Sequence, residues 1–587
     1  MRKIINLLVS FILITTTLIT TNAQTKEKDL SIKERVDNYL SEGERNGFSG
    51  AVLIAQKGTI ILNKGYGLAS REKSIANTPN TVFSTGSVTK QFTATAILKL
   101  VELNQLKLTD SLELFFDNLP EDKRKITIHQ LLTHSAGFID VISNGDFHHI
   151  PTKEFFKTLF HTKLRYTPGV KYKYSNAGYS ILARIIELVS KQSYESFLNT
   201  YLFTPAGMLQ TGYLLPKWKE NTLANGYYKG IKNLGTMVAR FERDQGVSWV
   251  LKGNGGIQST QEDMYKWYLA LESNTILSKK SMNLLTKPYI SEQEGSNKSF
   301  YAYGWAIFNS DRNTKIITHN GSNGIFFHEF MWLPKEDTVI IFSTNAYVRE
   351  VEVLWRLEKM IFNQNYTPKP IQKSSNVFVL NFIENNSFKK VKELKSNLKQ
   401  TYGDRFNDSN VLNQIGYLAL EKKELSDWAV PLFLMNTELF PKNANIWDSL
   451  GDGYKAIDDK VNAIKAYKKA LALDPTIEAS KKSLKAFGVK VKDNTASFIK
   501  LSPETIQSYI GTYQLTSGHF IKIFEKNEEL YIEFPGRTPM TLIPKTMVKF
   551  GIGSRSTTLS FNKNNSSKIV GFTINESGEQ MIAKKMG

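Results

Sequence analysis

The sequence of 587 residues contains no cysteine. Disulfide bonds, thiol nucleophiles, thiolate metal sites and a lipid-bearing N-terminal cysteine are therefore excluded, and stability has to come from packing. Histidine is scarce as well, with 8 residues. His134 and the His148-His149 pair lack clustered ligands at the spacing of a metal site, so we expect neither a metal nor a cofactor. We expect His134 to be a structural residue of a turn.

Long apolar runs are also rare, and only residues 4–19 approach the length of a targeting segment. Arg2 and Lys3 precede this run and Ala23 follows it, which predicts a secretory signal peptide over residues 1–23. The alternative is a retained membrane anchor, but an anchor needs about 20 apolar residues and this run is interrupted by three threonines. We therefore expect an exported protein, periplasmic or secreted, with no stable membrane anchor after cleavage.

Acidic residues are fewer than basic ones, 55 against 75, which gives a formal net charge of +20. Such a surplus can attract anionic polymers of a cell envelope, although a solvated, lysine-rich surface is the simpler interpretation. We expect no nucleic-acid partner, because the protein is predicted to be exported.

The length exceeds what one hydrophobic core supports, so several domains are expected. Within residues 24–365, strand patterns stand near both ends and the stretch between them is mainly helical, with clear helices at 87–103 and 177–189. This order predicts an α/β, or α+β, domain in which the two ends close one antiparallel sheet that helices flank. The predicted strands are residues 49–55, 59–66, 314–318, 329–333 and 339–344.

Two further regions follow a linker and helical connector at 366–405. Residues 406–490 are predicted to form α-helical tetratricopeptide-like hairpins, which would either bind a protein or peptide partner or act as a spacer. Residues 500–587 carry short alternating runs between Asn, Gly and Ser, which predict a small all-β sandwich or barrel without chemistry of its own. The clearest repeat is 444–477, whose motif positions are Trp447, Leu450, Gly451, Tyr454, Ala463, Tyr467, Ala470 and Pro475.

A candidate nucleophile lies in the segment STGSVTKQFTA, where Ser87 precedes Lys90 by one helical turn. At this spacing the amine of a helical Lys can reach the hydroxyl. The pattern alone is weak, because five other Ser-x-x-Lys matches occur in the chain. A capping Ser is often followed three residues later by Glu or Gln, whereas Lys90 faces the positive end of the helix dipole. This locally unfavourable charge indicates chemistry, and we expect Ser87 to be both helix cap and nucleophile.

Four further motifs follow along the chain. They are ITIHQLLTHSAGF at 126–138, Tyr174-Ser175-Asn176 just before a predicted helix, GNGGIQSTQEDMYKW at 253–267, and His319-Asn320-Gly321 directly after the predicted strand 314–318. Together with Ser87-x-x-Lys90 they resemble the serine β-lactamase-related family, which includes class C β-lactamases, DD-peptidases, esterases and D-aminopeptidases. The resemblance covers roughly residues 30–363, and His319-Asn320-Gly321 stands where the family has Lys-Thr-Gly.

The resemblance implies roles for the residues of the first two motifs. Ser87 would attack a carbonyl and form a covalent acyl-enzyme. Lys90 and Tyr174 would share the proton transfers, and the sequence leaves open which of them is the base. Asn176 would orient Lys90 and the substrate amide. The alternative for Tyr174 is a buried, hydrogen-bonded structural tyrosine.

The resemblance also implies a substrate-binding strand that contains Asn320 and Gly321. The backbone N–H groups of Ser87 and Ser322 would form the oxyanion hole. His319 departs from the β-lactamases, in which a Lys supplies permanent charge for a substrate carboxylate, because His is only partly charged near neutral pH. A catalytic role for His319 is expected, with a structural role as the alternative. This departure makes antibiotic hydrolysis a weaker prediction than hydrolysis of other amides or esters.

The sequence thus predicts an exported serine hydrolase that acts on an amide or ester bond of a small or peptide-like substrate, such as cell-wall or D-amino-acid peptides. One alternative is a β-lactamase or penicillin-binding DD-carboxypeptidase. Another is a non-catalytic envelope scaffold that binds peptides through its repeats, although the retained Ser87, Lys90 and Tyr174 argue against it. No deacylating Glu can be assigned, so the fate of the acyl-enzyme stays open.

Overall fold

The computed structural model describes residues 30–140, 150–346, 352–403, 406–491, 501–515, 520–526, 528–534, 539–552, 557–564, 566–576 and 579–586. The predicted signal peptide and the His148-His149 pair lie outside the described residues. The chain divides into two compact units between residues 378 and 379. Within the described ranges, no helix is both long enough and apolar enough to cross a membrane.

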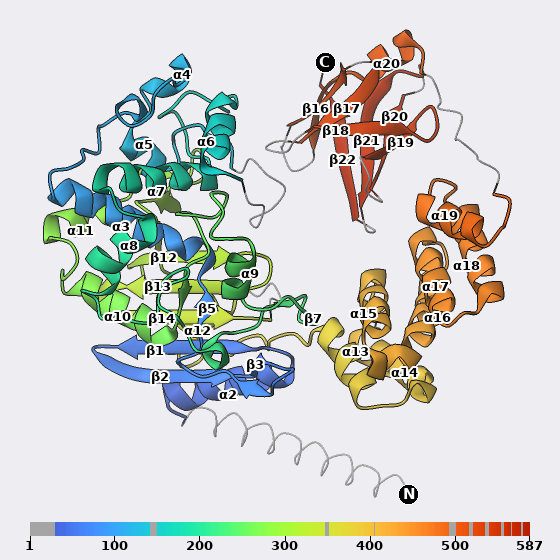
Figure 1. Ribbon diagram of the computed structural model, residues 1–587, viewed down its shortest axis with the longest axis horizontal. Helices are drawn as coiled ribbons and strands as arrows, with labels where there is room; N and C mark the ends of the chain where they lie inside the picture. Colours follow the sequence, from blue (N-terminus) through green and yellow to red (C-terminus); the bar gives the residue numbers. More distant parts are fainter. Residues whose placement is uncertain are drawn as a thin grey trace, which may run out of the picture. The chain divides into compact units, whose positions relative to one another are not determined.

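An eight-stranded antiparallel sheet forms the centre of the first unit (Figure 1). Gly50 pairs with Thr344 and Gln56 with Thr338, so a strand from each end of the domain meets in the sheet. The predicted α/β domain, with one antiparallel sheet closed by its two ends, is confirmed. In order across the sheet, the strands are β2 (Thr59–Tyr66), β1 (Gly50–Gln56), β14 (Thr338–Thr344), β13 (Phe327–Leu333), β12 (Lys315–Ser322), β11 (Ala306–Asn309), β10 (Ser299–Tyr301) and β9 (Ile290–Ser291).

Two apolar cores lie on opposite faces of this sheet, because successive side chains of a strand point to opposite sides. On β1, Ala51 and Leu53 belong to the larger core, whereas Val52 and Ile54 belong to the smaller one. Both faces are therefore covered by helices (Figure 1). The larger core includes residues of α3 (Thr89–Glu102), α7 (Asn176–Ser190) and α10 (Gln261–Glu272), and the smaller core includes residues of α2 (Ile32–Arg45) and α12 (Glu352–Phe362).

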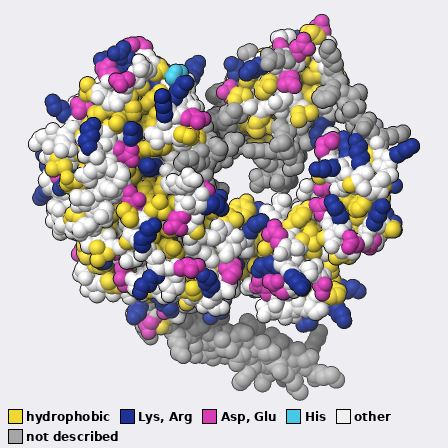
Figure 2. Space-filling view, in the orientation of Figure 1, with side chains coloured by type: hydrophobic (Ala, Val, Ile, Leu, Met, Phe, Trp, Pro, Cys, Tyr) yellow, Lys and Arg dark blue, Asp and Glu magenta, His cyan; other side chains and the backbone are white. Residues whose placement is uncertain are grey.

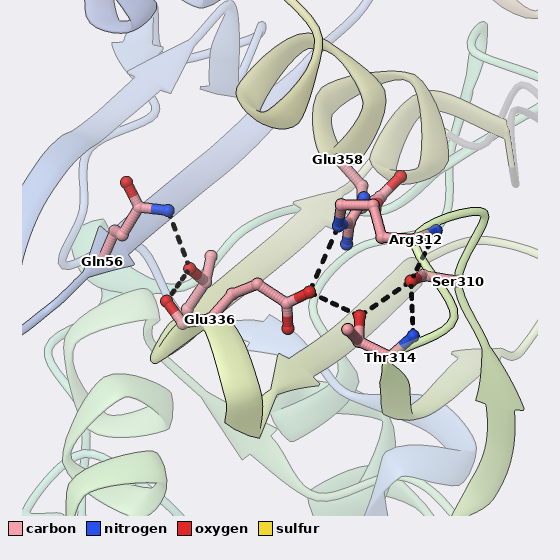
Figure 3. A network of polar contacts seen from close by, with 7 residues as sticks. Gln56, Ser310, Arg312, Thr314, Glu336 and Glu358 are labelled. Atoms are coloured by element: carbon pink, nitrogen blue, oxygen red, sulfur yellow. Dashed lines mark hydrogen bonds and ion pairs between the residues drawn. The ribbon is translucent and has the colours of Figure 1, made fainter.

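A polar network around Arg312 ties the far ends of the central strands to helix α12 (Figure 3). Arg312, in the turn between β11 and β12, lies 3.2 Å from Glu336 Oε1 and 2.5 Å from Glu358 Oε1. Thr314 donates a further hydrogen bond to Glu336. Glu358 is only 4% exposed, so its ion pair with Arg312 compensates for removing its charge from water.

The start of helix α3 differs from the prediction. The helix begins at Thr89, its N-cap is Val88, and Ser87 lies in a one-turn 3-10 helix, η1 (Gly86–Val88). The expectation that Ser87 caps the helix is therefore wrong. The physical reason is the close approach of β12, because Gly86 has φ of +50° and a Cβ atom there would lie 2.6 Å from Ser322 N.

The second unit begins with helices, and paired helices approach closely at glycine. A Cβ atom on Gly451 would lie 2.5 Å from Tyr467 Cε1, and one on Gly416 would lie 2.5 Å from Phe433 Cε1. The sequence spacing of these residues therefore has a packing reason, but their assignment as tetratricopeptide repeats stays a prediction. The helices are α13 (Ser375–Glu384), which spans the boundary, α14 (Val391–Tyr402), α15 (Ser409–Glu421), α16 (Ala429–Leu439), α17 (Ala444–Ala456), α18 (Lys460–Leu473) and α19 (Glu478–Ala486).

The chain ends in a closed eight-stranded antiparallel barrel, preceded by α20 (Pro503–Tyr509). Of the two predicted forms, sandwich or barrel, the barrel is the one observed. Its buried side chains include Tyr513, Phe550, Phe561 and Phe572, which pack ring against ring. The strands are β15 (Gly511–Leu515), β16 (Phe520–Lys526), β17 (Glu529–Glu533), β18 (Met540–Pro544), β19 (Lys549–Ile552), β20 (Thr558–Lys563), β21 (Ile569–Glu576) and β22 (Glu579–Lys585).

Candidate active site

Two glycines allow the Ser87 turn to pack closely against strand β12. A Cβ atom on Gly321 would lie 2.1 Å from Thr85 O and 2.4 Å from Ser87 N, distances that real Cβ atoms do not reach. Gly86 faces the same strand at Gly321 and Ser322. The backbone nitrogens of Ser87 and Ser322 therefore both lie at this contact between the turn and the strand, as expected for an oxyanion hole.

Lys90 is buried with 0% exposure and lies beside Ser87. Its Nζ donates to Asn176 Oδ1 at 2.7 Å, to the carbonyl of Asn254 at 2.7 Å and to Ser87 Oγ at 3.2 Å. The two shorter bonds fix the position of the amine beside the nucleophile. The structure thus brings together Ser87, Lys90 and Asn176, with Asn176 in contact with Lys90.

Tyr174 is half-buried and completes the surroundings of the Ser87 hydroxyl. Burial raises the pKa of the Tyr174 phenol, and a hydrogen bond from Ser87 opposes this shift. Lys90 Nζ lies 4.7 Å from the centre of the Tyr174 ring. Tyr174 is therefore a neutral phenol at neutral pH, a state in which it can donate a proton.

His134 supports the segment that carries Tyr174. Its backbone has φ of +55°, its Nδ1 accepts a hydrogen bond from Ser175 N at 3.1 Å, and its ring centre lies 4.3 Å from that of Tyr174. Burial, together with the charge of Lys90, lowers the pKa of His134 well below its ordinary value. A neutral, hydrogen-bonded His134 at this turn agrees with the structural role expected from the sequence.

His319 is neutral rather than partly charged. Burial, with a further contribution from the charge of Lys90, lowers its pKa to about 3. Its Nδ1 lies 2.6 Å from the carbonyl of Asn320, so Nδ1 carries the proton and Nε2 accepts from the Tyr301 hydroxyl at 3.0 Å. The partial charge expected from the free side chain is lost because the imidazole is removed from water.

A cleft of about 480 Å³ opens at Ser87. The residues that line the cleft come from segments far apart in the sequence. The lining residues are Ser87, Tyr172, Tyr174, Glu292, Tyr301, Ala306, Phe308, Thr318, His319, Asn320, Ser322, Glu329 and Trp355. Asn320 and Ser322 are exposed there, whereas Gly321 faces the Ser87 turn. In the described part of the chain, no group of three His, Asp or Glu residues could hold a metal ion.

Sequence reasoning missed several residues of the candidate site. Asn254 lies in a motif that the sequence analysis singled out, but it acts through its backbone carbonyl, which no side-chain pattern reveals. Tyr301 and Glu292 stand in the β9–β10 region, which has no recognisable motif. Tyr172 stands two residues before Tyr174 in a Lys-Tyr-Lys-Tyr run. This spacing was the available sequence signal that Tyr172 lies near the site.

Comparison with known proteins assigns the first unit. Residues 26–359 match the beta-lactamase family. The chain belongs to this family. The beta-lactamase family match includes all five motifs and ends before the second unit, so it places the first unit in a family of serine hydrolases and says nothing of residues 379–587.

Relatives within the beta-lactamase family include two proteins of Bacillus subtilis. Penicillin-binding protein PbpX is 34% identical over 270 residues, which are 46% of this chain and 65% of that protein. A second penicillin-binding protein is 28% identical over 340 residues, which are 55% of this chain and 74% of that protein. The crystal structure of a penicillin-binding protein from Bacillus halodurans aligns at 24% identity and a TM-score of 0.48, over 55% of this chain and 99% of that one.

Proposed function

We propose that the chain is an exported serine hydrolase that forms an acyl-enzyme on Ser87 and cleaves an amide or ester bond of a small or peptide-like substrate. The observation that carries this proposal is the convergence of two proton-transfer groups on one hydroxyl. Lys90 Nζ lies 3.2 Å from Ser87 Oγ, and Tyr174 shares a hydrogen bond with the same hydroxyl. Ser87, Tyr174 and Ser322 line the same cleft, and the buried Lys90 contacts Ser87 behind it.

The contacts of Lys90 support a role as proton acceptor. As a neutral amine, Lys90 would keep both of its N–H groups on Asn176 Oδ1 and Asn254 O at 2.7 Å. Its lone pair would then face Ser87 Oγ and take the hydroxyl proton as the oxygen attacks. The negative charge that forms on the carbonyl oxygen would be held by the N–H groups of Ser87 and Ser322.

Tyr174 is suited to the second proton transfer. Because burial keeps it a phenol, it can protonate the leaving group as the bond to the acyl carbon breaks. Lys90 then returns a proton to Tyr174, since both groups hydrogen-bond with the Ser87 hydroxyl that lies between them in the proton path. Attack of water on the Ser87 ester completes the cycle and regenerates the free hydroxyl.

The neutral state of His319 bears on the substrate. A neutral imidazole engaged by Asn320 and Tyr301 offers no positive charge for a substrate carboxylate. This favours amides and esters, including cell-wall or D-amino-acid peptides, over hydrolysis of β-lactam antibiotics. A DD-peptidase is the second candidate, because two relatives in Bacillus subtilis are named as penicillin-binding proteins.

The test uses the mature full-length protein with two covalent probes, a fluorescent penicillin and a fluorescent fluorophosphonate. We expect the fluorophosphonate to label the wild type and to leave Ser87→Ala unlabelled. Labelling by both probes would favour the penicillin-binding candidate. If neither probe gives a Ser87-dependent adduct while the protein is folded, the hydrolase proposal is wrong and a non-catalytic scaffold is favoured.

A further inference from the structure

Two carboxyl groups that the catalytic steps do not use line the Ser87 cleft. Glu292 follows strand β9, and Glu329 lies on β13 opposite Asn320. Both are partly or fully removed from water, and burial raises the pKa of each carboxyl group, that of Glu329 to about 8. Among the residues that the structure describes, no Lys or Arg contributes to the pKa of either group. Among the described residues that line the cleft there are two acidic side chains and no Lys or Arg.

Glu292 is held in one orientation by two hydroxyl groups. Tyr172 donates to Oε1 at 3.2 Å, and Ser299 donates to Oε2. A carboxylate has about four acceptor positions, so these two donors leave room for a donor from a ligand. Glu292 is half-buried at the wall of the cleft, where a bound group can reach it.

Glu329 provides an independent observation. It is 1% exposed, and its Oε2 is without a hydrogen-bond partner among the described residues. A side-chain hydrogen bond with Trp355 opposes the effect of burial on the pKa of this carboxyl group. A buried carboxyl oxygen without a donor is costly, and a ligand that brings an N–H donor into the cleft would remove this cost.

The position of Glu292 indicates which part of a substrate it would meet. Tyr172, which donates to Glu292, stands two residues before Tyr174, and the Tyr301 ring lies 5.6 Å from the Tyr172 ring and 6.4 Å from the Tyr174 ring. Glu292 therefore lies on the Tyr174 side of Ser87. Under the proposed mechanism Tyr174 protonates the leaving group. The leaving group is thus the part of the substrate that approaches Glu292.

We infer that the substrate carries a primary ammonium on its leaving group and that Glu292 binds this ammonium, with Glu329 as a second, more buried acceptor. This inference rests on the proposed function and names its substrate class. In the reaction, the bond between the acyl carbon and the leaving nitrogen breaks, and that nitrogen takes the proton of Tyr174. Water then releases the acid from Ser87, so the products are a carboxylic acid and an amine that keeps its second ammonium.

The first measurement is direct binding to full-length protein with Ser87→Ala, by ligand-observed NMR and calorimetry. The probes are hexylammonium and 1-hexanol, which have the same carbon chain and differ in charge. A charge-assisted hydrogen bond adds about 1.5 kcal/mol or more, so we expect hexylammonium to bind about tenfold more tightly than hexanol. Adding Glu292→Gln should remove this difference in affinity. Equal binding of the two probes to the Ser87→Ala protein that retains Glu292 would overturn the inference.

A matched control separates charge from location. Glu294 lies two residues from Glu292 and is exposed, so Glu294→Gln removes the same charge from the same hairpin region. We expect Glu294→Gln to keep the preference for hexylammonium. An equal loss in both variants would mean that general surface charge, and not the Glu292 site, attracts the amine. Thermal melting of both variants checks that Glu292→Gln leaves the fold intact.

The second measurement compares two amides of N-acetyl-D-alanine with the otherwise wild-type mature protein. The 5-aminopentyl amide and the hexyl amide are nearly isosteric, and release of N-acetyl-D-alanine is followed by chromatography. We expect kcat/KM to be about tenfold higher for the charged amide, through a lower KM, and the preference to disappear in Glu292→Gln. A Ser87-dependent fluorophosphonate adduct without any amine preference overturns only this inference. Amine binding at Glu292 without any Ser87 adduct overturns the proposed function alone.

Discussion

Replacing Gly321 with alanine tests whether the contact between β12 and the Ser87 turn sets the oxyanion site. The new Cβ atom would lie 2.1 Å from Thr85 O and 2.4 Å from Ser87 N, so the strand would have to retreat by about 1 Å. A donor that starts near 2.9 Å from a developing oxyanion would then be beyond hydrogen-bond distance. Loss of one such donor lowers the rate by about 100- to 1,000-fold, which corresponds to about 2.7–4 kcal/mol in the transition state.

The assay for Gly321→Ala is the second-order rate constant for labelling of Ser87 by a fluorophosphonate. The control is Gly178→Ala in α7, where the nearest atom to the added Cβ is Ser175 Oγ at 3.6 Å, an ordinary contact. We expect Gly178→Ala to label within about twofold of wild type, and crowding in Gly321→Ala to lower stability by about 1–3 kcal/mol. If folded Gly321→Ala labels as fast as wild type, the assignment of the oxyanion hole to these N–H groups is refuted.

Three further predictions concern Lys90, His319 and Arg312. Lys90→Met should lower the labelling rate by about 100-fold or more, since the proton acceptor is lost. Lys99→Met, on the same helix, should leave the labelling rate unchanged. Equal labelling rates for the two variants would contradict the mechanism. Burial lowers the pKa of His319 to about 3, below the ordinary 6.5. As the pH falls, the unfolded chain therefore binds this proton before the folded chain does. The free energy of unfolding from urea titrations should therefore decrease as pH falls from 6.5 towards 3, and His319→Gln should flatten this part of the curve. Arg312→Met leaves Glu358 buried without its partner and should cost about 3–5 kcal/mol in the same assay, much of which a second substitution, Glu358→Gln, should restore; no recovery would mean that packing of the Arg312 side chain dominates.

The architecture of the first unit followed from local patterns. Apolar alternation at 49–55 and 339–344 predicted strands that the structure pairs as β1 and β14. The end of β12 could not be predicted in this way, because residues 319–322 are polar and small and become a strand only by pairing with β13. The start of α3 was misplaced for a similar reason, since the packing of Gly86 against Ser322 makes the turn at Ser87 tighter than a helix cap.

The sequence predicted which residues come together at the candidate site, but not the electrostatics of the site. Lys90 and Asn176 stand 86 residues apart and are in contact in the structure. The pKa of His319 could not be read from its motif, because the shift depends on burial and on the nearby Lys90. Glu292 and Glu329 carry no motif, and only the fold brings them to the wall of the Ser87 cleft.

The sequence by itself determined the order of the motifs, the sheet closed by the two ends of the domain, and the absence of cysteine chemistry. These properties depend on residue type and on short-range periodicity, and both can be read from the sequence of each segment alone. Tertiary structure alone decided that His319 is neutral, that Ser87 lies in a 3-10 turn, and that two carboxyl groups without cationic neighbours among the described residues share the cleft. Burial and the distance between charges depend on the whole packed fold, so no local pattern can specify them.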